Sequence, residues 1–260
     1  MLERDVEVAR WLANLGLRLP AILAVDRKAR QVVLEDFGEE DAEATLRAVA
    51  PDRRAAILET LLTPLEVLAA VPPERLPDWN PPLDERRLRW ELAGFELWFV
   101  RHTRGVTPPV ALSSWLDDLA RAVSRHPRRV CHRDYHLNNL FVLGHREIGV
   151  IDAQDLLVGP DTYDAVSLMC ERAMLEIVPE TERRNWRRTW AERTGAEPGW
   201  EDRWRAVRLQ RALKVLGTFA RLEAAGRPRY RAWAVSIAAA LAADRNELDL
   251  PRAVTDLLLD

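Results

Sequence analysis

Residues 130–168 read VCHRDYHLNNLFVLGHREIGVIDAQDLLVGPDTYDAVSL. Short apolar runs at 130–131, 140–143 and 148–151 are separated by polar residues and by Gly144. This pattern is typical of small strands that flank loops. We therefore expect a polar loop that contains Asp134 and Asn139, followed by a strand that ends at Asp152.

The spacing of these three polar residues fits phosphoryl transfer. That reaction needs a carboxylate to orient the attacking hydroxyl and accept its proton, and oxygen ligands for Mg²⁺. The pattern HxDxxxxN at 132–139, with an acidic residue at the end of a later strand, supplies both. Asp134 is the candidate base, and Asn139 and Asp152 are the candidate metal ligands. The alternative is a polar loop with a capping Asp and a second Asp in a turn.

Outward from this segment, the chain alternates little between strand and helix. Residues 2–15 have apolar positions at three- and four-residue spacing, and two short strands are expected at 21–25 and 31–35. A loop with five prolines covers 71–82. Ser113 or Ser114 is a candidate cap for a helix that runs to 126. Further helices are expected at 52–70, 84–101, 162–176, 180–193, 200–225 and 229–244. This order predicts an α+β fold rather than repeated βαβ units.

The composition is that of a globular protein with a core. The 260 residues are 48% hydrophobic and 30% charged, which argues against a disordered, collagen-like or coiled-coil chain. The net charge of −3 gives no basic excess for nucleic acid or an anionic membrane. Cys131 and Cys170 form no metal or disulfide motif. No signal peptide or membrane-length apolar run is seen. We therefore expect a cytoplasmic monomer that binds neither nucleic acid nor membrane.

The segment at 130–168 resembles the aminoglycoside phosphotransferase and choline kinase superfamily, which has a protein-kinase-like fold. VVLEDFG at 32–38, WELAGFELWFVRH at 90–102 and LQRALKVLGTFARL at 209–222 are similar to one branch. These are the bacterial anomeric kinases of N-acetylmuramate and N-acetylglucosamine in cell-wall recycling. The resemblance covers nearly the whole chain. It implies an ATP- and Mg²⁺-dependent kinase acting on a small-molecule sugar.

The resemblance also implies roles for individual residues. Asp134 matches the catalytic Asp, and Asn139 and Asp152 match the Mg²⁺ ligands. His132 matches a structural histidine under the catalytic loop, and Asp164 matches a carboxylate that braces this loop. The backbone of Glu35, Asp36 and Phe37 matches the connector that pairs with adenine.

The superfamily has three strands before the helix with which this sequence starts. They carry a phosphate-covering loop and a lysine that binds the ATP phosphates. Lys28 and Lys214 are the only lysines, and Lys28 lies in the wrong place. We therefore expect a protein-kinase-like bilobal fold whose N-lobe is a remnant at 1–38, with a mostly helical C-terminal lobe at 39–260. A start site upstream and a short protein with little kinase activity both remain open, and the intact catalytic loop favours the first.

Four residues are candidates for substrate binding. Arg211 and Lys214 lie three residues apart and would suit the carboxylate of N-acetylmuramate. The alternative for Lys214 is an ion pair between helices. Glu91 could bind sugar hydroxyls or pair with a neighbouring arginine, and His136 could touch substrate or brace its loop. A kinase for an aminoglycoside, choline-like or other hydroxyl substrate, and a non-catalytic kinase-like binding module, are the competing interpretations.

Overall fold

The computed structural model describes residues 2–144 and 146–259. The chain packs as two compact units, one made of residues 1–82 and 128–198 and the other of residues 83–127 and 199–260. Each helix in the described ranges is too short or too polar to cross a bilayer. The expected boundary after residue 38 separates the two lobes of a kinase-like fold. These compact units are defined differently, so that boundary stays a prediction.

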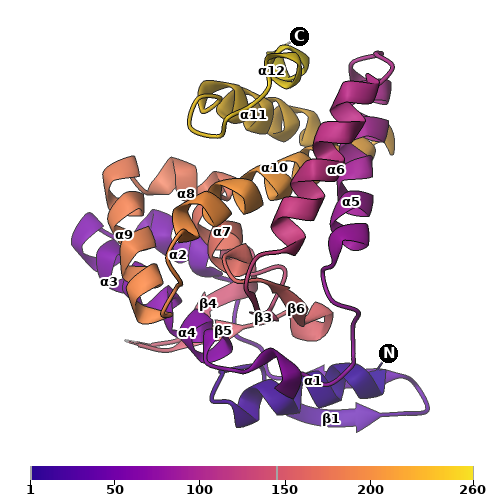
Figure 1. Ribbon diagram of the computed structural model, residues 1–260. Helices are drawn as coiled ribbons and strands as arrows, with labels where there is room; N and C mark the ends of the chain where they lie inside the picture. The colour runs from indigo at the N-terminus through magenta and orange to yellow at the C-terminus, as the bar shows by residue number, and fades with distance from the viewer. Residues whose placement is uncertain (1, 145, 260) are drawn as a thin grey trace. The chain divides into compact units, whose positions relative to one another are not determined.

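The first unit begins with α1 (Leu2–Asn14) and the antiparallel pair β1 (Ile22–Asp26) and β2 (Gln31–Leu34) (Figure 1). The helix forms because one face carries apolar residues such as Val8 and Leu12, which are fully buried. It ends before Gly16, whose positive φ of 92° suits the turn that follows. The helix and both strands lie where the sequence predicts them.

Two further strand pairs build the centre of the first unit. β4 (Leu140–Val142) pairs with β5 (Ile148–Val150), as the sequence predicts. β3 (Arg128–Cys131) pairs with β6 (Leu157–Pro160), a strand that was not predicted from the sequence. Both pairs are antiparallel.

Helices complete this unit: α2 (Ala42–Ala48), α3 (Pro51–Leu61), α4 (Thr63–Ala69), α7 (Tyr163–Met169), α8 (Arg172–Ile177) and α9 (Glu180–Arg193). The prediction of one helix over 162–176 is wrong. The chain breaks at Glu171, whose backbone is extended (φ −70°, ψ 157°). Its carboxylate there accepts a hydrogen bond from the backbone N–H of Leu137 (2.9 Å). The break therefore connects the helical layer to the loop with Asp134.

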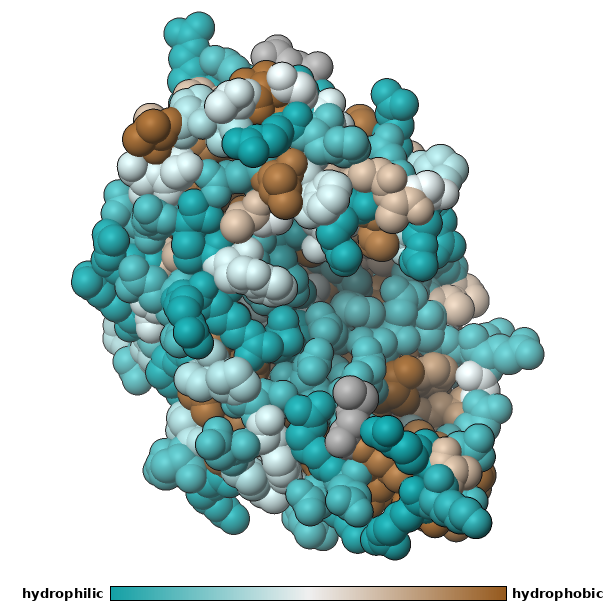
Figure 2. Space-filling view, turned by 90° about the vertical axis from the view of Figure 1, so that its right-hand side faces the viewer, coloured by the Kyte–Doolittle hydropathy of each residue, from teal (hydrophilic) through white to brown (hydrophobic). Residues whose placement is uncertain are grey.

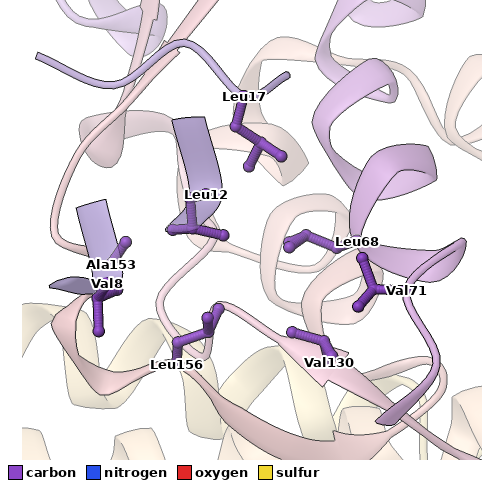
Figure 3. Close-up of a cluster of buried hydrophobic side chains, with 8 residues drawn as sticks. All are labelled: Val8, Leu12, Leu17, Leu68, Val71, Val130, Ala153 and Leu156. Carbon is purple, nitrogen blue, oxygen red and sulfur yellow. The ribbon is translucent and has the colours of Figure 1, made fainter. Parts of the chain in front are cut away.

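A hydrophobic cluster joins α1 to the segment after Asp152. Figure 3 shows Val8 and Leu12 of α1 facing Ala153 and Leu156, with Leu68 and Val130 beside them. Leu12 and Leu156 are fully buried. Burying a leucine side chain contributes about 1.5–3 kcal/mol. The cluster fixes the first helix against the turn that follows the candidate metal ligand.

The second unit is helical: α5 (Glu85–Gly94), the π-helix η2 (Phe95–Thr103), α6 (Val110–Ser124), α10 (Trp200–Ala224), α11 (Arg229–Ala243) and α12 (Arg252–Leu259). The expected cap at Ser113 or Ser114 is wrong, because α6 starts after Pro109, whose ring presets the backbone. α5 and α10 approach closely at two glycines. A Cβ on Gly217 would lie 2.5 Å from the backbone carbon of Gly94. Glycine at 217 therefore permits this helix crossing.

Candidate active site

The β4–β5 hairpin brings Asn139 and Asp152 to the same end of two antiparallel strands. Asn139 directly precedes β4, and Asp152 lies two residues after β5. The register pairs Leu140 with Val150, and the N–H of Ile151 donates to the carbonyl of Asn139 (3.0 Å). The two residues that the sequence separates by the hairpin are thus neighbours in space.

The loop with Asp134 is tied to the same hairpin end. The side-chain amide nitrogen of Asn139 donates to the backbone carbonyl of Asp134 (2.9 Å). Tyr135 is buried, and its hydroxyl donates to the carbonyl of Leu61 (2.8 Å). The half-buried Asp134 is therefore held between an anchored tyrosine and Asn139.

His132 lies beneath this loop and has no contact with solvent. Its Nε2 lies 3.0 Å from the carbonyl of Ile151, the residue before Asp152. Burial lowers the pKa of His132 to about 4, against the opposing effect of the Asp134 carboxylate. The ring is thus neutral near pH 7 and links the start of the loop to the end of β5.

Asp164 binds the backbone of the same loop. Its two carboxylate oxygens accept hydrogen bonds from the N–H groups of His132 (2.6 Å) and Arg133 (2.9 Å). Arg133 has a φ of 78° and Asp152 a φ of 63°. Residues other than glycine adopt this left-handed backbone conformation mainly when surrounding contacts hold them there. Both turns of the site therefore depend on contacts from elsewhere in the fold.

A pocket of about 580 Å³ adjoins the hairpin end. Its lining includes Asp152 and the connector residues Glu35, Asp36 and Phe37. The other walls are mainly apolar side chains of α1, of the segment at 19–22 and of β2, β4 and β5. Figure 2 shows hydrophobic side chains gathered around a hollow at the height of α1 and β1, in a face that is otherwise mostly hydrophilic. A cavity of this size and polarity suits a small molecule with a flat apolar part.

The connector is held by an arginine that the sequence analysis did not single out. Arg18 donates to both carboxylate oxygens of Glu35 (2.5 and 2.8 Å), and its guanidinium lies 4.9 Å from the ring centroid of Phe37. The hydrogen bond from Arg18, with a second from the N–H of Ala21, lowers the pKa of Glu35 to about 2. The Glu35 side chain is thus engaged with protein groups at the edge of the pocket.

Phe37 packs closely on the hairpin. A Cβ on Gly149 would lie 2.5 Å from the ring of Phe37, and the ring centroid of Phe141 is 5.6 Å away. Glycine at 149 therefore makes room for the aromatic wall of the pocket. No spacing rule in the sequence identifies this contact, because the two residues lie more than a hundred positions apart.

The donor set fits a magnesium ion. The amide nitrogen of Asn139 is used by Asp134, which directs the amide oxygen away from that bond. One oxygen of Asp152 accepts from Gln154 Nε2 (2.5 Å), and the carboxylate is exposed at the pocket. Within residues 2–144 and 146–259, no three His, Cys, Asp or Glu side chains cluster as a metal site. Mg²⁺ typically takes one or two protein oxygens and completes its shell with water and phosphate.

The substrate candidates separate into two groups. His136 lies in the loop, 3.4 Å from the Asn139 amide nitrogen. Glu91, Arg211 and Lys214 lie in the second unit. Glu91 is buried and accepts from Gln210 Nε2 (3.0 Å), and Lys214 Nζ lies 4.0 Å from the other Glu91 oxygen. The ion pair between helices, one of the alternatives for Lys214, is thus present.

Residues 2–208 match the phosphotransferase enzyme family, and the chain belongs to this family. A relative from Pseudomonas aeruginosa, named N-acetylmuramate/N-acetylglucosamine kinase, is 35% identical over 237 residues. That match covers 86% of this chain and 68% of the relative. A Caulobacter vibrioides relative of the same name is 30% identical, and the match covers 86% of this chain and 65% of the relative. The predicted resemblance to this branch is confirmed.

Solved structures confirm the α+β, protein-kinase-like fold. An aminoglycoside phosphotransferase from Streptomyces rimosus, in complex with ADP and streptomycin, has a TM-score of 0.59 at 20% identity. The likeness covers 82% of each chain. A choline/ethanolamine kinase family protein from Mesorhizobium loti has a TM-score of 0.63 at 15% identity and covers 99% of this chain and 82% of the other. The fold is therefore one whose solved members include a nucleotide complex.

Proposed function

We propose that the chain is an ATP- and Mg²⁺-dependent kinase that phosphorylates the anomeric hydroxyl of N-acetylmuramate or N-acetylglucosamine, as a step of peptidoglycan recycling. One observation carries this proposal. A single hairpin end holds Asn139 and Asp152 beside the loop with Asp134, and Asp152 lines a pocket of about 580 Å³. The names of the relatives supply the sugar class.

In this proposal the pocket takes the nucleotide. Apolar side chains of α1, β2 and the hairpin contact the flat base, with Phe37 and Phe141 among them. The N–H of Glu35 is already bonded to the carbonyl of Ala21 (2.9 Å). The adenine edge would therefore pair with the other backbone groups of residues 35–37. Arg18 keeps that segment in place through Glu35.

Asp134 accepts the proton of the attacking sugar hydroxyl. As that proton leaves, the hydroxyl oxygen forms a bond to the γ-phosphorus, the bond from this phosphorus to the bridging oxygen breaks, and ADP leaves. Asn139 and Asp152 would hold Mg²⁺, which neutralises charge on the phosphate oxygens when bound. Asp164, His132 and Tyr135 keep the loop rigid, so Asp134 needs little reorganisation during the reaction.

The sugar candidates stay those of the second unit and the loop. In the second unit, Lys214 and the buried Arg211 are candidates to bind the carboxylate that distinguishes N-acetylmuramate, and Glu91 is a candidate to bind a hydroxyl. In the loop of the first unit, His136 is a separate candidate to bind a hydroxyl. The Glu91 contact of Lys214 corresponds to the competing role of this lysine as a structural cation.

The decisive experiment measures ADP release by the 260-residue chain with Mg-ATP. The acceptors are N-acetylmuramate, N-acetylglucosamine, kanamycin and choline, and Asp134→Asn is the matched control. We expect turnover on an N-acetyl sugar and a loss of at least about 100-fold in the control. Turnover on kanamycin or choline alone would overturn the sugar assignment. A folded chain that binds ADP without turnover on any acceptor would instead be a binding module.

The position of phosphorylation has its own readout. Phosphorylation at the anomeric carbon removes the reducing end of the sugar, so the reducing-sugar signal should fall in step with ADP formation. The methyl glycoside of N-acetylglucosamine lacks a free anomeric hydroxyl and should be inert. Turnover on the methyl glycoside would place the reaction at another hydroxyl.

A further inference from the structure

Asn80 connects three separate parts of the first unit. It lies in the proline-rich loop at 71–82, outside any helix or strand. Both hydrogen bonds of its amide nitrogen reach the turn after Asp152, at the carbonyls of Gln154 (3.0 Å) and Leu156 (2.9 Å). Its amide oxygen accepts from Arg4 of α1 (3.2 Å). One side chain thus uses two donors and one acceptor on partners at least 74 residues away.

The turn that Asn80 holds has little support of its own. Ala153–Asp155 forms a single 3₁₀ turn, closed by one bond from the Leu156 N–H to the Ala153 carbonyl (3.2 Å). Asp152 before it has a left-handed backbone, with φ 63° and ψ 39°. Such a conformation costs about 1–2 kcal/mol and persists where other contacts fix it. The two bonds from Asn80 are contacts of that kind.

The connection continues to the carboxylate. Gln154, whose carbonyl Asn80 holds, donates its side-chain amide to Asp152 Oδ1 (2.5 Å). A shift of the turn would therefore move the group that orients the Asp152 carboxylate. Figure 3 shows the packing on the other side of the turn, where Ala153 and Leu156 meet Val8 and Leu12. Apolar packing thus holds the side chains of the turn, and Asn80 binds two of its backbone carbonyls.

The residue type and its neighbours suit this task. Two carbonyls need two N–H donors, which Asn supplies and Asp does not. Pro77, Pro81 and Pro82 restrict the backbone around Asn80, which lowers the entropy lost when the loop is ordered. Trp79 packs edge-to-face on Trp11 of α1, with ring centroids 5.7 Å apart. The loop that carries Asn80 thus has contacts of its own with α1.

We propose that Asn80 is a positioning residue for the metal end of the nucleotide site: by holding the turn at 153–156 it keeps Asp152 in the orientation that binds Mg²⁺. This inference rests on the proposed function, because it takes Asp152 as a metal ligand. Asn80 itself does not line the pocket. Its effect should therefore appear in the magnesium dependence of nucleotide binding rather than in binding of the base.

The test compares the Kd of ADP with Mg²⁺ and with EDTA, by calorimetry, for the wild type and Asn80→Leu. Leucine has a similar shape and no hydrogen-bonding groups. We expect the Kd with Mg²⁺ to rise about 10-fold, because both hydrogen bonds from Asn80 to the turn are lost and a tenfold change in Kd corresponds to about 1.4 kcal/mol. The Kd in EDTA should stay within about twofold. Asn185→Leu, the same change at an exposed site, should alter neither value.

Two further variants keep the proposal falsifiable. Gln154→Leu removes the next link and should reproduce the magnesium-selective loss, including in the event that Asn80→Leu does not fold. In an Asp152→Asn background, Asn80→Leu should have no further effect, because coupled residues are not additive. Equal changes of both Kd values, or none, in folded Asn80→Leu would overturn the role of Asn80 and leave the kinase standing. A wild type that binds ADP no better with Mg²⁺ than with EDTA would overturn both.

Discussion

Asp164 Oδ1 accepts a hydrogen bond of 2.9 Å from the backbone N–H of Arg133, whose φ of 78° lies in the left-handed region. The second oxygen of the same carboxylate binds the N–H of His132 at 2.6 Å. One buried carboxylate thus satisfies two consecutive donors at the point where the chain turns toward Asp134. The contact explains how a strained arginine is held directly before the candidate base.

Asp164→Asn should lower kcat about 10- to 100-fold and leave the Kd of ADP within twofold. One carboxylate oxygen becomes an amide nitrogen that opposes a backbone N–H, which costs about 1–3 kcal/mol. Steady-state kinetics measure kcat, calorimetry measures the Kd of ADP, and denaturant unfolding measures the loss of stability. Asp118→Asn, at an exposed helix position, is the matched control. An unchanged kcat in a folded Asp164→Asn variant would contradict the bracing role.

Gly149→Ala should weaken nucleotide binding about 5- to 10-fold, with and without Mg²⁺. The added methyl group would lie 2.5 Å from the Phe37 ring, so this ring, which lines the pocket, must shift. Overpacking of this kind costs about 1–3 kcal/mol. Gly144→Ala is the control, because a Cβ there meets nothing within 4 Å. Similar ADP affinities for the two variants would show that Phe37 does not border the bound nucleotide.

Protonation of His132 should destabilise the fold as the pH falls from about 6.5 to 4. Burial lowers its pKa in the folded state to about 4, so the unfolded chain binds more protons in this window. The free energy of unfolding is therefore highest above pH 6.5, where His132 is neutral in both states, and falls by roughly 3 kcal/mol once the pH is below 4. Urea unfolding at several pH values gives the free energy of unfolding as a function of pH. Between pH 4 and 6.5 this free energy should depend less on pH for His132→Gln than for the wild type. His102→Gln, at an exposed position, should keep the wild-type slope.

Gly217→Ala should destabilise the second unit by about 1–3 kcal/mol. Its Cβ would lie 2.5 Å from backbone atoms of Gly94 and Phe95, and a backbone cannot move aside as a flexible side chain can. Gly94→Ala, on the facing helix, has nothing within 4 Å of its Cβ and should be neutral or stabilising. Thermal unfolding of both variants tests this, and equal melting temperatures would refute the close helix crossing.

Lys214→Ala should raise the KM for N-acetylmuramate more than that for N-acetylglucosamine. Only the first sugar has a carboxylate for the ammonium group to bind. Lys28→Ala, the other lysine, should change neither KM. Equal effects of Lys214→Ala on both sugars would assign this lysine to its ion pair with Glu91 alone.

The sequence alone was sufficient to predict the family and the class of fold, and it placed the candidate site. Asp134, Asn139 and Asp152 stand at short, fixed spacings in one segment, and a hairpin between adjacent strands needs no distant partner. The apolar period of α1 and the runs at 140–143 and 148–151 are likewise local signals. The helix and the two strands lie where these signals predicted them. The resemblance of the sequence motifs to kinases predicted the family.

Only the tertiary structure decided which contacts hold the candidate site in place. Arg18 with Glu35, Asn80 with Gln154, Gly149 with Phe37 and Glu171 with Leu137 are separated by 17 to 112 positions, and no period or turn rule joins them. At the break before α8, Glu171 accepts a hydrogen bond from Leu137 in the loop with Asp134, a distant contact that a helical pattern does not predict. Local propensities act over a few residues, whereas partners for buried polar groups are selected by packing across the whole fold.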